Sequence, residues 1–158
     1  MKRQGFSLIE AMLAVTLVGL AIASLVAANG SFTRSNGAGA TLSTAEFLLE
    51  QIRELTAALP VVDPEPKTRS FGPEETSLAD YDDLDDFDGA TFCPPIAADR
   101  TTLADFAAFT QQVTVENVNP SNFALVVEDH GSEFVRVTVR VLRNSTEITS
   151  ASWIRARR

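Results

Sequence analysis

Six aspartates stand within nine residues of one polar segment that ends at Gly89. They are Asp80, Asp82, Asp83, Asp85, Asp86 and Asp88. A hard cation such as Ca²⁺ takes about six to eight oxygen ligands, and a tight turn helps to gather them. The spacing departs from an EF-hand loop because no glutamate closes the coordination at its expected place. Two interpretations stay open: a calcium site, with Ca²⁺ as the candidate cofactor, and a solvated acidic loop held to the surface by Leu84 and Phe87.

Near the N-terminus, a long apolar stretch contains a single charged residue, Glu10. Residues 11–28 have no charge at all, and about 20 apolar residues in a helix cross the hydrocarbon core of a membrane. Lys2 and Arg3 precede the stretch, which predicts a cytoplasmic N-terminus and an exported C-terminal part. A carboxylate in such a helix is costly and normally has a partner. Glu10 is therefore a candidate functional residue.

Three interpretations of this segment differ in how they treat Glu10. A secretory signal would be cleaved after Ala28, where small residues form a plausible site. An uncleaved signal anchor would keep the segment as a plain membrane helix. Both leave the carboxylate without a role, whereas a third interpretation gives it one.

The stretch from Lys2 to Glu10 (KRQGFSLIE) resembles the prepilin recognition motif of the type IV pilin-like family. That motif has a short basic leader, a glycine, Phe-Ser-Leu-Ile-Glu and an apolar helix. The resemblance implies that prepilin peptidase cuts between Gly5 and Phe6 and that the new amino group of Phe6 is N-methylated. It also implies that Glu10 pairs with the N-terminal amine of a neighbouring subunit during assembly.

The resemblance further implies a structural subunit of a type IV pilus or a type II secretion pseudopilus. The implied partners are prepilin peptidase, other pilin or pseudopilin subunits, an inner-membrane assembly platform and membrane lipid. The implied location is the bacterial inner membrane, crossed once, and then the filament. No proline interrupts residues 6–28, which favours a minor pilin or a pseudopilin. The alternative is a signal-anchored extracytoplasmic binding domain, calcium-dependent or not, that does not polymerise.

Composition argues against several other functions. A formal charge of −8 and a pI near 4.6 disfavour nucleic acid as a partner. The single cysteine, Cys93, excludes an intramolecular disulfide and is interpreted as a small apolar filler. The single histidine, His130, rules out His-rich metal sites and is interpreted as a turn residue. No catalytic motif is present, so we expect no enzymatic activity.

The predicted leader (residues 1–5) and apolar helix (residues 6–28) are followed by a region whose structure is predicted from the spacing of its glycines and apolar residues. Three glycines within residues 29–41 predict a bend. Ser43 and Glu46 form a capping-box pattern that predicts the start of a second, amphipathic helix, completing the region 29–59. Its apolar stripe comprises Ala45, Leu48, Leu49, Ile52, Leu55 and Leu59.

The remaining sequence predicts a small sheet after a long connection. Prolines and acids make residues 60–105 a predicted loop region outside the core. Within residues 106–158, alternating apolar and polar residues predict antiparallel strands, most clearly at 134–142, with partners at 109–116 and 147–155. Residues 123–127 are either a short strand or loop. The predicted fold is α+β: a long N-terminal helix with a glycine-rich break, whose amphipathic part packs on the sheet.

Overall fold

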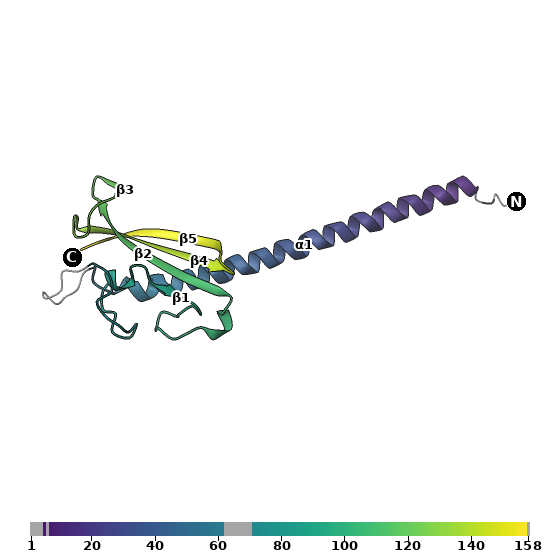
Figure 1. Cartoon of the computed structure of the whole chain (residues 1–158). Coiled ribbons are helices and arrows are strands. Elements are labelled where there is room, and N and C mark those ends of the chain that lie inside the picture. The colour runs from purple at the N-terminus through teal and green to yellow at the C-terminus, as the bar shows by residue number, and fades with distance from the viewer. Residues whose placement is uncertain (1–4, 6, 62–70, 158) are drawn as a thin grey trace. The chain divides into compact units, whose positions relative to one another are not determined.

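The computed structural model describes residue 5, residues 7–61 and residues 71–157. Residues 1–4, Phe6, residues 62–70 and Arg158 lie outside the described residues. The chain divides into two compact units, residues 1–40 and 41–158, and each is treated by itself. One long helix, α1 (Leu8–Ala57), contributes to both units (Figure 1).

The predicted break at residues 29–41 is wrong, because α1 runs through this stretch as continuous helix. A glycine costs about 1 kcal/mol relative to alanine in a helix interior, but extending an existing helix avoids the larger cost of nucleating a new one. The predicted helix start at Ser43 is wrong for the same reason. Ser43 lies well inside α1, so it is not an N-cap.

An antiparallel sheet forms the second unit, as predicted. The described residues contain five strands: β1 (Thr91–Phe92), β2 (Phe109–Asn119), β3 (Asn122–Val126), β4 (Phe134–Arg143) and β5 (Thr146–Ala156). The order is β1-β2-β4-β5, and β3 pairs with the end of β2. The valines of β4 alternate inward along its length, so one face of the sheet is apolar.

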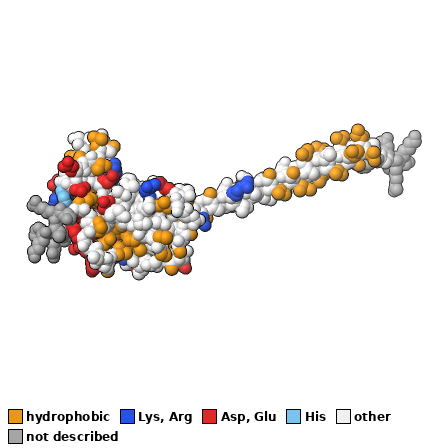
Figure 2. Space-filling view, in the orientation of Figure 1, with side chains coloured by type: hydrophobic (Ala, Val, Ile, Leu, Met, Phe, Trp, Pro, Cys, Tyr) orange, Lys and Arg blue, Asp and Glu red, His pale blue; other side chains and the backbone are white. Residues whose placement is uncertain are grey.

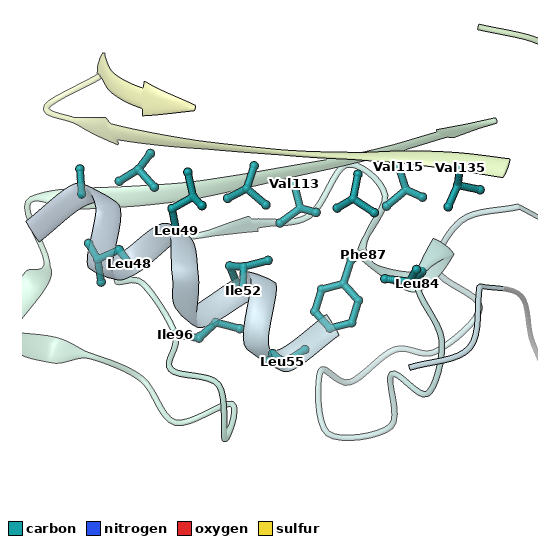
Figure 3. Packing of buried hydrophobic residues seen from close by; sticks show 14 of the residues in the cluster. Leu48, Leu49, Ile52, Leu55, Leu84, Phe87, Ile96, Val113, Val115 and Val135 are labelled. Atoms are coloured by element: carbon teal, nitrogen blue, oxygen red, sulfur yellow. The ribbon is translucent and has the colours of Figure 1, made fainter. Parts of the chain in front are cut away.

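The core lies between this face of the sheet and the second-unit part of α1 (Figure 3). Most of the predicted stripe is buried, with Leu48 and Ile52 fully so, and Leu59 packs at the edge. The valines opposite are Val113, Val115, Val135, Val137, Val139 and Val141. Burial of each such side chain contributes about 1.5–3 kcal/mol, so this contact is the main source of stability for the second unit.

The Pro- and Asp-rich region contributes more to the core than the sequence predicts. The 3₁₀ helix η1 (Asp85–Phe87) and the residue before it place Leu84 and Phe87 at 0% exposure in the core (Figure 3). A second 3₁₀ helix, η2 (Ala104–Phe106), and strand β1 also fall within residues 60–105. The predictions of a loop outside the core and of a surface attachment through Leu84 and Phe87 are therefore wrong. So is the filler role of Cys93, which is exposed.

A buried glutamine joins three elements of the second unit. Gln111 on β2 is fully buried, and its Nε2 donates to the carbonyl oxygens of Leu48 on α1 (2.8 Å) and Ile96 (3.1 Å). Its Oε1 accepts from the backbone N–H of Ile96 at 2.8 Å. The side chain thus satisfies both backbone groups of a buried residue that belongs to no strand or helix.

We expect Gln111→Leu to lower the free energy of unfolding by about 2–5 kcal/mol. Each buried backbone group left without a partner costs about 1–3 kcal/mol, and Ile96 would lose two. Urea unfolding of the full chain in detergent, followed by Trp153 fluorescence, measures the change. Gln112→Leu is the matched control, because Gln112 is the neighbouring residue on the half-buried, opposite face of β2. Equal losses in the two variants would contradict the role of Gln111.

A residue of the edge strand β5 forms hydrogen bonds at the C-terminal end of α1. Arg155 on β5 donates from Nη1 to the carbonyl oxygen of Thr56 (2.8 Å) and from Nη2 to that of Leu59 (2.9 Å). The last carbonyl groups of a helix lack partners within it and carry partial negative charge. A guanidinium group there satisfies them and complements the helix dipole.

Candidate functional site

The first unit presents apolar side chains without covering them. Large hydrophobic residues of α1 from Leu8 to Phe32 are between 58% and 82% exposed. Hydrophobic side chains cover this part of the helix in the space-filling view (Figure 2). A helix that is apolar around its circumference is stable only when lipid or other helices surround it. Among the described residues, α1 is the helix long and apolar enough to cross a membrane.

Polar side chains inside this apolar segment bond back to the helix itself. Thr16 Oγ1 donates to the carbonyl oxygen of Leu13 and Ser24 Oγ to that of Leu20, both at 2.8 Å. These hydroxyl groups therefore enter an apolar environment with their hydrogen bonds already made. Since the rest of residues 11–28 is apolar, the carboxylate of Glu10 is the one group of residues 6–28 that carries charge.

The capping pattern that the sequence analysis placed at Ser43 instead describes the start of α1. Ser7 Oγ accepts from the backbone N–H of Glu10 at 3.3 Å, and the Ser7 carbonyl oxygen accepts from Ala11 N–H at 3.1 Å. Ser7 thus caps the helix, and Glu10 occupies its first turn, where the helix dipole favours a negative charge. Gly5 is exposed, whereas Phe6 lies outside the described residues.

In the second unit, the structure brings together part of the predicted aspartate set. Carboxylate oxygens of Asp82, Asp83 and Asp86 lie within 4.8 Å of one another. The same holds for Glu74, Glu75 and Asp86, so Asp86 is common to both groups. We refer to these five residues as the acidic cluster.

The predicted residues outside these groups have other surroundings. Asp80 is exposed and belongs to neither group. Asp88 Oδ1 accepts from Val115 N–H at 2.8 Å and so fixes the loop to β2. Asp85 is buried beside Asp83 and Glu74 but also belongs to neither group. Three of the six predicted aspartates therefore lie in these carboxylate groups, together with two glutamates that were not predicted as site residues. That any of them binds a metal stays a prediction.

Each buried aspartate of the cluster uses one oxygen to hold the local backbone. Asp86 Oδ2 accepts from the N–H groups of Asp82 (2.9 Å) and Asp83 (3.3 Å). Asp83 Oδ1 accepts from those of Asp85 (3.0 Å) and Asp86 (3.2 Å). The opposite oxygens, Asp83 Oδ2 and Asp86 Oδ1, are buried without a hydrogen-bond partner among the described residues.

Burial and mutual repulsion make the negative forms of these carboxyl groups unfavourable. Burial, then the neighbouring carboxyl group of Asp85, raises the pKa of Asp83 to about 8. The neighbouring carboxyl group of Asp86, then desolvation, raises the pKa of Glu75 to about 7. Burial is also the main cause that raises the pKa of Asp85. None of the three ion pairs between described residues involves Glu75, Asp82, Asp83 or Asp86.

Together, the elements define an α+β fold with a pilin-like arrangement, in which one long helix precedes a small antiparallel sheet. Residues 1–26 match the family model for the prokaryotic N-terminal methylation motif. The motif implies processing by prepilin peptidase and assembly with other pilins, and with the apolar helix it indicates a membrane-anchored, single-pass protein. The proteins that carry this motif are structural rather than catalytic. No curated protein and no solved structure gives a significant match to the chain.

Proposed function

We propose that this protein is a minor subunit of a type IV pilus or a type II secretion pseudopilus. In this proposal it is inserted in the inner membrane with its N-terminus in the cytoplasm, cut between Gly5 and Phe6, and N-methylated on Phe6. It is then assembled through the apolar part of α1. The observation that carries the proposal is the exposed apolar helix, which follows a methylation motif and contains one carboxylate, Glu10.

The chemistry of assembly follows from the cost of isolated charge in lipid. Cleavage would create an amino group at Phe6, which is positively charged at neutral pH and lies four residues before Glu10. A carboxylate and an ammonium group are each expensive in an apolar medium, and pairing offsets part of this cost. Pairing between neighbouring subunits would fix the axial position of one helix against the next, while the surrounding apolar side chains bury one another.

We expect mass spectrometry of the protein from isolated membranes to find a chain that starts at Phe6 and is heavier by one methyl group. The negative control is Gly5→Val, which we expect to keep the leader. A side chain at Gly5 meets nothing within 4 Å among the described residues, so lost cleavage would report recognition by the peptidase rather than a folding defect.

Two other N-termini would contradict the proposal. A chain that starts after Ala28 would indicate a secreted domain released by an ordinary signal peptidase. An intact Met1 in cells with active prepilin peptidase would indicate a plain membrane anchor, and would favour the tethered binding domain over the filament subunit.

A further inference from the structure

We propose that the acidic cluster is a Ca²⁺ site in which Asp86 is the central ligand. The other candidate ligands come from the two groups that share Asp86: Glu74 and Glu75 in one, Asp82 and Asp83 in the other. The proposal concerns the second unit alone and does not depend on the filament function.

The first step of the argument is the unsatisfied charge. Asp83 and Asp86 are each 1% exposed, both belong to the cluster, and one oxygen of each is buried without a hydrogen-bond partner among the described residues. Glu75 Oε2 is also buried without a hydrogen-bond partner among the described residues. A buried carboxylate oxygen without a donor or a cation is strongly unfavourable. Since several occur together, a bound cation is one means by which all of them can be satisfied at once.

The second step is the geometry. Calcium–oxygen distances are about 2.3–2.6 Å, so two oxygens on opposite sides of one ion are about 5 Å apart. Ligand atoms within 4.8 Å of one another fit around such an ion. Both groups of carboxylates contain Asp86, so an ion beside it can take ligands from either one. The two backbone N–H groups that hold Asp86 Oδ2 fix this side chain before an ion arrives.

The third step is the choice of ion. The donors in the cluster are all carboxylate oxygens, which suit hard cations; Zn²⁺ prefers histidine and cysteine, and neither occurs in the cluster. Mg²⁺ requires nearly ideal octahedral geometry and usually keeps several waters, so it is seldom held by many protein carboxylates. Ca²⁺ accepts higher coordination numbers and irregular geometry. The donor set therefore favours Ca²⁺ over both competitors.

The position of the cluster indicates what the ion would do. Leu84 and Phe87 alternate in sequence with cluster residues, and both are fully buried in the core. Neutralising the carboxylates would therefore hold η1 against α1 and the sheet. In this role Ca²⁺ stabilises the second unit, as a structural ion does in other small domains.

The test is calorimetric titration of the metal-stripped, detergent-purified full chain with CaCl₂, and separately with MgCl₂. We expect saturable Ca²⁺ binding with a Kd at or below the range of about 10⁻⁴–10⁻³ M that extracellular calcium modules show. We expect weaker binding of Mg²⁺ and a higher Tm in Ca²⁺ than in EGTA. Asp86→Asn keeps an oxygen for the two backbone N–H groups but removes the charge, and we expect it to weaken binding at least tenfold.

Two further variants keep the proposal falsifiable. Glu75→Gln should also weaken binding, and it accepts none of the hydrogen bonds that hold η1, so it serves if Asp86→Asn fails to fold. Asp80→Asn is the matched control and should bind as the wild type does, because Asp80 lies in the same loop but in neither carboxylate group.

A different source of positive charge would overturn the proposal. Lys67 and Arg69 precede the cluster in the sequence and lie outside the described residues. Absence of saturable Ca²⁺ binding, together with a lower Tm in the double variant Lys67→Gln/Arg69→Gln, would assign neutralisation to the chain's own side chains. Equal Ca²⁺ affinity in Asp86→Asn, Glu75→Gln and the wild type would equally refute the site.

Discussion

Replacing Glu10 with alanine is expected to reduce incorporation into filaments to less than about a hundredth of the wild-type level, while processing and membrane insertion continue. Removing one partner of a buried ion pair costs about 3–5 kcal/mol, which is more than a hundredfold in an association constant. The effect should not come from the helix itself. Ser7 Oγ bonds to the backbone N–H of residue 10, which alanine retains, and alanine is a strong helix former.

Three measurements on the same cells separate assembly, insertion and processing. Immunoblots of sheared filaments measure incorporation, immunoblots of membrane fractions measure insertion, and mass spectrometry of the N-terminus measures processing. Glu46→Ala is the matched control, because Glu46 is an exposed glutamate of α1 that lies beyond the apolar segment. Unchanged incorporation of Glu10→Ala would remove the pairing role of the carboxylate. Loss of membrane insertion would instead show that the residue acts before assembly.

A second large effect is expected in the core, where Phe87→Ala should lower the free energy of unfolding by about 3–5 kcal/mol. Phe87 is fully buried and makes edge-to-face contacts with the rings of Tyr81 (centroids 5.1 Å apart) and Phe92 (6.4 Å). Removing the ring leaves a cavity between η1, α1 and the sheet. Since whole domains are stable by only about 5–15 kcal/mol, this variant is expected to be close to unfolded at 37 °C.

Urea unfolding of the full chain in detergent, with EGTA present, measures this loss apart from any effect of Ca²⁺. Phe123→Ala is the control that removes the same side chain from β3, where it is 41% exposed, and the expected change is below about 1 kcal/mol. A similar loss in both variants would mean that the ring of Phe87 contributes no more than a surface aromatic residue.

The elements with regular periodicity could be predicted from the sequence. The apolar helix, the stripe around Leu48 and Ile52, and the valine strand β4 each repeat with the period of the structure they form, and burial on one face enforces that period. The bend predicted from the glycines of residues 29–41 is wrong because the low helix propensity of glycine costs less than is gained by extending a helix that has already formed.

The acidic cluster could be predicted only in part, because its carboxylates are brought together by tertiary contacts. The run of aspartates at 80–88 indicated where the acidic cluster lies, but Asp80 and Asp88 belong to that run and not to the cluster. Glu74 and Glu75 carry no motif, and only the path of the chain places them beside Asp86. Leu84 and Phe87 lie among charged residues and have no periodic pattern, so their depth in the core could not be read from hydropathy.

The contact between Arg155 and the end of α1 has a consequence for the order in which parts of the chain fold. The partners are 99 residues apart in sequence for Thr56 and 96 for Leu59. Contacts of such high sequence separation form late, because the entropy of closing the intervening chain must be overcome first. The C-terminal end of α1 and the strand that contacts it can therefore meet only after the chain has been made as far as β5. If the chain is exported as proposed above, this contact forms only after β5 has crossed the membrane, whereas the apolar part of α1 can enter the bilayer earlier.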